Sequence, residues 1–198
     1  MYVEGGGQGR LRAACREGFS SFFEKAGLAG RMPSIVACGS RDDTLKRFRI
    51  ASRRAGSEEI PLLLVDSEES VPINRTSWQH LRTRDGWERP ENARNEQGHL
   101  MVQCMESWFL ADVSALESFF GAGFRSASLS RRGDIENIPK GDVFDQLTLA
   151  SRNSRKGTYH KGSHSLEILA NIDPAKVVHC SPFAKRLVEA LKEHLIPF

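Results

Sequence analysis

Short apolar runs and helical apolar stripes alternate along the first half of the chain. Runs rich in β-branched residues predict strands at residues 1–4, 33–38, 60–66 and 99–104. Between them, apolar residues recur every three or four positions, and this spacing predicts helices over residues 10–28, 42–55 and 78–84. The first helix has an apolar face made of Leu11, Cys15, Phe19, Phe22, Phe23 and Ala26. Strands alternating with helices in this way predict a parallel sheet joined by right-handed crossovers.

The run at residues 60–66 gives the strongest strand signal in the chain. Its apolar stretch is continuous and ends at Asp66. A strand of this kind is buried on both faces of a parallel sheet. We therefore expect it near the centre of the sheet.

The second half of the chain predicts helices and two long loops. Loops are expected over residues 121–141, rich in Gly, Ser and Arg, and over the basic stretch 152–163. The predicted helices cover residues 106–110, 114–120, 142–151, 166–170 and 183–195. The last has one stripe of Phe183, Leu187, Leu191 and Leu195, with Ala184 and Val188 beside it. We predict an α/β fold with a small parallel sheet flanked by helices: a single domain over residues 1–198, with a βα core over 1–112 and a helical extension over 113–198.

Composition agrees with a globular protein outside the membrane. The chain has 198 residues, of which 39% are hydrophobic and 27% charged. No apolar run has the length of a membrane span, and no signal peptide is recognisable. The four cysteines are far apart and lack metal-ligand spacing, so we expect reduced thiols in a cytoplasmic protein. A net charge of +3 permits a phosphate-bearing partner without requiring one.

Acidic side chains follow two of the predicted strands. Glu4 comes after the first strand, and Asp66 and Glu68 come at the end of the third. Because parallel strands end at the same edge of a sheet, these carboxylates are expected to meet there. Carboxylates without His or Cys partners favour a hard cation such as Mg²⁺ or Mn²⁺. The alternative is that each acid only caps a helix or lies in a solvated loop.

A glycine turn follows Glu4. Gly5, Gly6 and Gly7 let backbone N–H groups approach a phosphate, and the helix that begins at Arg10 adds a favourable dipole. The alternative is a plain turn. Acids, a cation and a phosphate-accepting turn together indicate phosphoryl-transfer chemistry.

These elements resemble the Toprim domain of topoisomerases, primases and OLD-family nucleases. The resemblance lies in Val3-Glu4-Gly5-Gly6 and in Leu64-Val65-Asp66-Ser67-Glu68. Residues 105–112 (MESWFLAD) and 159–164 (YHKGSH) further resemble a family of small standalone Toprim-like proteins, some of which occur in phage-defence systems beside an ABC-type ATPase. The resemblance covers nearly the whole chain.

The resemblance implies a nuclease that depends on Mg²⁺ or Mn²⁺ and hydrolyses phosphodiester bonds in DNA or RNA, as an antiviral defence effector. Glu4 matches a metal ligand or general base, and Asp66 and Glu68 match a pair of metal ligands. Glu68 departs from the family pattern, which has Asp. Gln8 also departs, because related nucleases often have an acid there. The implied partners are nucleic acid and an ABC-type ATPase encoded nearby, with a homodimer left open.

Two further groups are candidates for the same site. Glu106 becomes a fourth metal ligand if the fourth strand lies beside the first; otherwise it is an acid that complements a helix dipole. Lys161 is a catalytic candidate that would stabilise charge on the transferring phosphate. The basic residues Arg152, Arg155 and Lys156 would contact the nucleic-acid backbone, unless this loop is simply solvated. The arginine-rich face of the helix over 42–55 is predicted to be ordinary surface.

Two other functions stay open at this stage. A Toprim-like domain can serve as a non-catalytic binding subunit of an ATPase complex. A small-molecule phosphatase on a similar sheet is the third alternative, and neutralising the basic loop should harm it far less than a nuclease.

Overall fold

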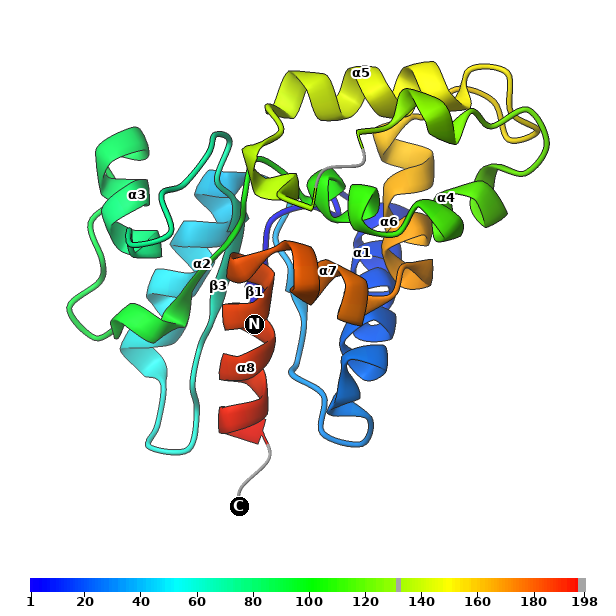
Figure 1. The fold of residues 1–198 in the computed structure, drawn as a ribbon. Coiled ribbons are helices and arrows are strands. Elements are labelled where there is room, and N and C mark those ends of the chain that lie inside the picture. The colour runs from blue at the N-terminus through cyan, green and yellow to red at the C-terminus, as the bar shows by residue number, and fades with distance from the viewer. Residues whose placement is uncertain (131–132, 196–198) are drawn as a thin grey trace.

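The computed structural model describes residues 1–130 and 133–195 and has an α/β fold (Figure 1). Its parallel sheet has the strand order β2–β1–β3–β4. The strands are β1 (Tyr2–Val3), β2 (Val36–Ala37), β3 (Leu63–Asp66) and β4 (Gly98–Met101). The predicted strands are confirmed, and β3 is interior with all four residues buried. Each strand is shorter than the run predicted for it.

The helices of the first half lie where their apolar stripes predict them. They are α1 (Arg10–Phe23), continued by a π-helical turn (Glu24–Leu28), then α2 (Arg41–Arg54) and α3 (Ser77–Asp85). The Ser40 hydroxyl caps α2 by accepting the Asp43 N–H, and Thr76 forms a capping box with Gln79 on α3. The prediction that Leu11 belongs to the buried apolar face of α1 is wrong. Leu11 lies in the first turn, ahead of the buried residues that begin at Cys15, and is 41% exposed.

The second half is mainly helical, as predicted. It contains a 3₁₀ helix (Met105–Ala111), α4 (Val113–Phe120), α5 (Lys140–Ser151), α6 (Lys161–Asn171), α7 (Pro174–Cys180) and α8 (Pro182–Leu195). The predicted loop over 152–163 is too long, because α6 begins at Lys161. Short 3₁₀ turns (Ser126–Ser128, Ile135–Asn137) interrupt the loop predicted over 121–141, of which 131–132 lie outside the described residues. The sequence did not predict α7, or the short 3₁₀ turn (Asn95–Gln97) that leads into β4.

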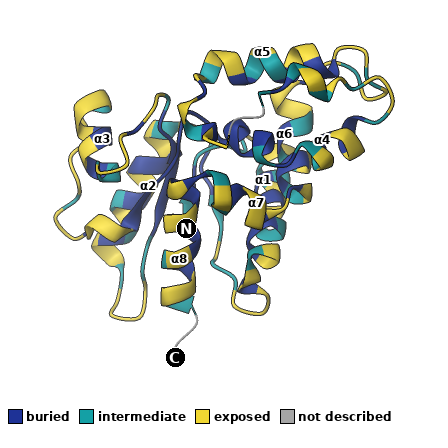
Figure 2. Cartoon of the chain, in the orientation of Figure 1, coloured by how far each residue is buried: buried dark blue, intermediate teal, exposed yellow. Residues whose placement is uncertain are grey.

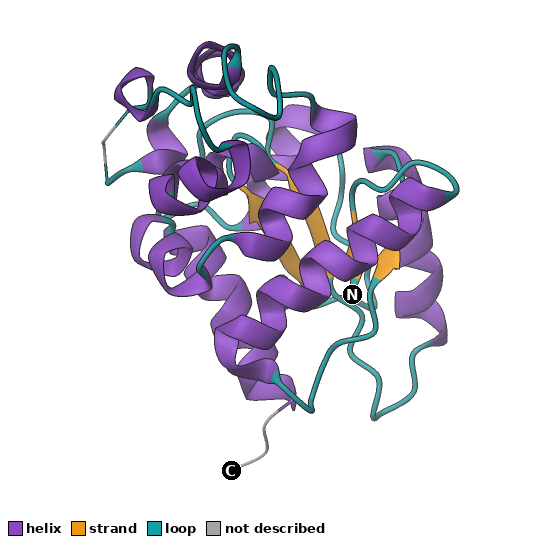
Figure 3. Cartoon of the chain, turned by 90° about the vertical axis from the view of Figure 1, so that its right-hand side faces the viewer, coloured by secondary structure: helices purple, strands orange, loops and turns teal. Residues whose placement is uncertain are grey.

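Helices cover both faces of the sheet (Figure 3). Alternate residues of β3 point to opposite faces: Leu64 joins the larger hydrophobic cluster with Phe19 of α1, whereas Leu63 and Val65 join a second cluster with Phe48 of α2. The larger cluster contains residues from both the 1–112 and the 113–198 segments. Figure 2 shows the strands and the inward sides of the helices as buried. All four cysteines are free thiols.

The connections reverse direction between β1 and β3. The chain leaves β1 toward β2 on one side and leaves β3 toward β4 on the other. The carboxyl ends of β1 and β3 therefore flank a topological switch point, where open α/β sheets form their ligand sites. The α5 helix lies above this edge, at the top of Figure 1. Among the described helices, none is both long and apolar enough to cross a membrane.

Candidate metal centre

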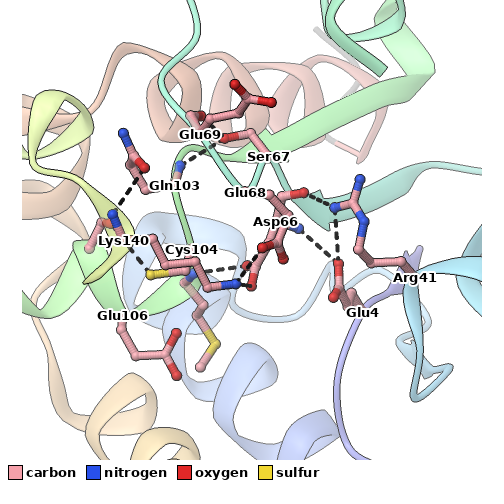
Figure 4. Close-up of polar contacts among 12 residues, drawn as sticks. Glu4, Arg41, Asp66, Ser67, Glu68, Glu69, Gln103, Cys104, Glu106 and Lys140 are labelled. Atoms are coloured by element: carbon pink, nitrogen blue, oxygen red, sulfur yellow. Dashed lines mark hydrogen bonds and ion pairs between the residues drawn. The ribbon is translucent and has the colours of Figure 1, made fainter. Parts of the chain in front are cut away.

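Three carboxylates meet at the switch point (Figure 4). Glu4 follows β1, Asp66 is the last residue of β3, and Glu68 lies two residues further along the chain. One oxygen from each of the three lies within 4.8 Å of the other two. The structure thus brings together the three acids that the strand ends predicted.

Backbone N–H groups orient two of these carboxylates. The Asp66 N–H donates to Glu4 Oε2 at 3.0 Å, and the Met105 N–H donates to Asp66 Oδ1 at 2.9 Å. These bonds leave Asp66 Oδ2 facing the lysines on α5 and α6. The backbone of β3 thus orients Glu4, and the backbone of the 3₁₀ helix that begins at Met105 orients Asp66.

The third carboxylate stands on an unusual backbone. Glu68 has a φ of 69° and Gln103 a φ of 64°, and these are the only positive values among the described non-glycine residues. The Glu68 N–H donates to the Gln103 carbonyl at 3.0 Å, and the Gln103 N–H donates to Ser67 Oγ at 2.8 Å. Non-glycine residues in this conformation are enriched at functional sites because packing must hold them there. The two segments lock each other and fix the position of Glu68.

Each carboxylate also faces a basic side chain. Arg41 Nη1 lies 3.5 Å from Glu4 Oε2 and also donates to the Asp66 carbonyl. Lys140 Nζ donates to Glu68 Oε2 at 2.7 Å and lies 4.0 Å from Asp66 Oδ2. Lys161 Nζ lies 3.9 Å from Asp66 Oδ2. Three acids and three cations therefore share the carboxyl edge of the sheet.

The pKa shifts show where negative charge is hardest to hold. Burial, followed by repulsion from Glu4, raises the pKa of Asp66 to about 8, although Lys161 opposes the shift. Burial also raises the pKa of Glu4, against the opposing effect of Arg41. Burial acts in the same direction on Glu68, but the Lys140 hydrogen bond and charge outweigh it and lower the pKa. Additional positive charge beside Glu4 and Asp66 would stabilise their ionised forms.

Glu106 lies apart from the other three acids (Figure 4). Glu106 was expected to be a fourth metal ligand if the fourth strand lay beside the first. This arrangement is wrong, because β4 pairs with β3 and not with β1. Its carboxyl group is fully buried, and the Tyr159 hydroxyl donates to Oε1 at 3.0 Å. Lys161 Nζ lies 3.5 Å from the same oxygen, while Oε2 has no hydrogen-bond partner in the described part of the chain. Glu106 thus contacts the cluster through Lys161.

The glycine turn gives the chain room beside the acids. The Gly5 N–H donates to the Gly39 carbonyl at 2.8 Å, so it is already used within the protein. A Cβ on Gly6 would lie 2.8 Å from Cys15 Cβ and 2.9 Å from Ala37 Cβ, a contact that only glycine avoids. Gly7 and Arg10 are exposed. A pocket of about 240 Å³ opens beside Glu4 and Asp66, and Gly5, Gly6 and Lys161 also line it.

The predicted basic segment divides into two parts. Lys161 begins α6 and reaches the carboxylates. Arg152, Arg155 and Lys156 follow the last residue of α5. The segment between α5 and α6 lies at the far right of Figure 1, away from β1 and β3. There Lys156 Nζ donates to Glu167 Oε1 at 2.7 Å. The structure does not bring these three residues to the cluster.

Sequence reasoning missed two cations of the cluster. Arg41 begins α2 after the short turn that follows β2, so the rule that strand ends share an edge also applies to it. Lys140 carries no such signal, because it is 72 residues away from Glu68 in the chain. Only the packing of α5 over the sheet edge brings it there.

The donor set fits a hard divalent cation. All three clustered ligands are carboxylate oxygens, which suit Mg²⁺ or Mn²⁺ better than softer metals. Burial and repulsion from Glu4 raise the pKa of Asp66, so a bound cation would stabilise its ionised form. Residues that could hold the ion are therefore Glu4, Asp66 and Glu68.

A protein-family model matches almost the whole chain. The family model described as "Domain of unknown function (DUF4276)" matches residues 3–192. No curated protein and no solved structure matches the chain.

Proposed function

We propose that this chain, which belongs to the DUF4276 family, is a nuclease that requires Mg²⁺ or Mn²⁺ and hydrolyses phosphodiester bonds in DNA or RNA. The observation that carries the proposal is the convergence of Glu4, Asp66 and Glu68 within 4.8 Å at the switch point of a parallel sheet. The Toprim-like sequence elements, which include all three residues, support it further. A location in the cytoplasm is part of the same proposal.

The three carboxylates would hold the metal in this proposal. A bound divalent cation supplies positive charge for the phosphate oxygens and lowers the pKa of a water molecule. Arg41 keeps the Glu4 carboxylate oriented through its ion pair. Lys161 is 54% exposed and stands beside the pocket, where its ammonium can contact a phosphate oxygen. Glu106, which accepts a hydrogen bond from the Tyr159 hydroxyl, pairs with this lysine from the buried side.

A second candidate function is a non-catalytic binding subunit, and one observation favours it. Arg41, Lys140 and Lys161 already face the acids, so these ion pairs can balance the charge of the carboxylates without a metal ion. The partner in that case would be an ABC-type ATPase, which the sequence resemblance suggests. Antiviral defence as the cellular role depends on the same resemblance.

Metal binding and cleavage together separate the two functions. Calorimetry with Mn²⁺ and cleavage of DNA and RNA panels should be measured for wild type, Glu4→Gln and Asp66→Asn. We expect wild type to bind Mn²⁺ and cleave, and both variants to lose at least about a hundredfold in cleavage while remaining folded. Glu193→Gln, an exposed acid on α8, is the matched control and should cleave as wild type does.

Equal cleavage by wild type and Asp66→Asn would contradict the nuclease proposal. If the wild-type protein does not bind Mn²⁺ and does not cleave any nucleic acid, the result favours the non-catalytic binding subunit.

A further inference from the structure

The outer face of α2 carries five basic residues that lack acidic partners. They are Lys46, Arg47, Arg49, Arg53 and Arg54. Across residues 1–130 and 133–195, none of the five forms an ion pair. The contact recorded for Arg49 is with a backbone carbonyl, that of Glu88, at 3.5 Å. By contrast, Lys156, Lys176 and Lys185 each face a carboxylate. The charge on α2 is thus available to an external anion.

A groove runs along this basic face. It has a volume of about 470 Å³ and lies between α2 and the residues that follow α3. Lys46, Arg49 and Arg53 line it together with one acid, Asp42, and three apolar residues, Leu45, Ile50 and Trp87. The basic residues of the lining therefore outnumber the acidic one. Ile50 is 42% exposed, and Trp87 is half-buried with one part packed on the smaller hydrophobic cluster. Cations and an aromatic ring therefore occupy the same concave surface.

Arg41 connects the groove to the carboxylates. Its guanidinium lies 5.0 Å from the centre of the Trp87 ring, and Nη1 lies 3.5 Å from Glu4 Oε2. It is also the first residue of α2, so the helix runs from the site along the groove. Twelve residues separate Arg41 from Arg53, a rise of about 18 Å. The Trp87 end of the groove therefore lies beside the arginine that contacts Glu4.

We propose that the groove between α2 and Trp87 binds single-stranded nucleic acid and leads it to Glu4, Asp66 and Glu68. The three unpaired cations that line the groove complement the repeating phosphates, and the exposed part of the indole ring offers a surface for base stacking. Duplex nucleic acid keeps its bases stacked on one another, so it gains only the charge contribution. This inference rests on the proposed function for the cleavage of the strand at the carboxylates. It places the substrate on the basic face of α2, which the sequence predicted to be ordinary surface.

Binding without cleavage tests the groove separately from the chemistry. The probes are fluorescent single-stranded DNA and RNA about 15 nucleotides long, and duplex DNA of the same sequence, measured by anisotropy in EDTA. The test variant is Lys46→Glu/Arg53→Glu. Its matched control is Lys185→Glu/Lys192→Glu, which changes charge equally at the same seven-residue spacing, on exposed sites of another 14-residue helix.

We expect the groove variant to bind single strands at least about tenfold more weakly than wild type, and the control to bind within about twofold. Because each lost phosphate contact lowers the salt slope by about 0.7 for single strands, the slope of log affinity against log salt should fall by about 1.4. Trp87→Leu should weaken single-strand binding about fivefold and leave duplex binding nearly unchanged. Comparison of the DNA and RNA probes identifies which single strand the groove prefers. Binding of either single strand supports the inference if the groove variant weakens it.

Equal single-strand binding by the groove variant and wild type would overturn the inference, as would tighter binding of duplex than of single strands. If wild type cleaves with Mn²⁺ while the groove variant binds and cleaves normally, the groove fails and the nuclease stands. If wild type binds single strands through the groove but never cleaves, the groove stands and the nuclease fails.

Discussion

Asp66 combines the features that a metal ligand in this cluster needs. It is the last residue of an interior strand, its Oδ1 is oriented by the Met105 N–H, and its Oδ2 faces two lysines at 4.0 and 3.9 Å. Burial and the neighbouring Glu4 raise its pKa. The carboxylate is therefore rigid and favours nearby positive charge, which either the lysines or a divalent cation can supply.

Lys140 competes with a metal ion for the same oxygens. Its ammonium donates to Glu68 Oε2 at 2.7 Å, so a cation that binds Glu68 must displace it. We expect Lys140→Met to bind Mn²⁺ about tenfold more tightly than wild type, a difference of about 1.4 kcal/mol measurable by calorimetry. Lys156→Met is the control, because Lys156 makes a glutamate ion pair of the same 2.7 Å length away from the cluster. Unchanged or weaker Mn²⁺ binding by Lys140→Met would count against the competition.

His99 makes stability depend on pH. Burial, with a smaller contribution from His194, lowers its pKa from 6.5 to about 4. Between these values the unfolded chain binds a proton that the folded protein excludes, so the free energy of unfolding falls as pH decreases from 6.5 to 4. The full loss is about 3 kcal/mol, and it is absent above pH 6.5.

The His99→Gln variant should lack this dependence. Denaturant unfolding of both proteins from pH 7 to pH 4 tests it, because the acidic residues titrate in both and cancel in the difference. A difference in free energy of unfolding that stays constant across this range would contradict the assignment to His99.

At the scale of elements, α1 and α6 pack closely through a glycine. A Cβ on Gly18 of α1 would lie 2.8 Å from the Leu166 carbonyl oxygen of α6. Alanine normally stabilises a helix relative to glycine by about 1 kcal/mol, but this backbone oxygen cannot move without shifting α6. We expect Gly18→Ala to destabilise the protein by about 1–3 kcal/mol in denaturant unfolding.

Gly141 of α5 is the matched control for Gly18. A Cβ there meets no atom within 4 Å, so Gly141→Ala should be neutral or stabilising by up to about 1 kcal/mol. The same sign of effect for both substitutions would show that the contact between α1 and α6 is not as close as described.

The elements also show what the sequence could predict. Apolar periodicity located β1 to β4 and the helices of the first half, since burial on a sheet or along a helix imposes its own spacing. It placed the start of α6 five residues late, because Lys161, Gly162 and Ser163 form a polar first turn without an apolar stripe. Helix α7 was missed for a similar reason, since its seven residues are too few to show a period.

At the scale of the whole molecule, the candidate site is assembled from both halves of the chain. The strand ends supply Glu4, Asp66 and Glu68, which topology alone brings to one edge, so the sequence could predict them. Lys140 and Lys161 come from helices that pack over that edge. Residues 113–198 thus complete the charge balance of the site. Contacts of this kind depend on tertiary packing and leave no local pattern in the sequence.

The central claim is that the three carboxylates form a divalent metal centre. Anomalous diffraction from crystals of the wild-type protein soaked with Mn²⁺ tests it most directly. The account predicts one dominant peak at coordination distance, about 2–2.5 Å, from oxygens of Glu4, Asp66 and Glu68, with the Lys140 ammonium moved away from Glu68. No peak at this position, with Lys140 still bound to Glu68, would contradict the metal centre and the nuclease built upon it.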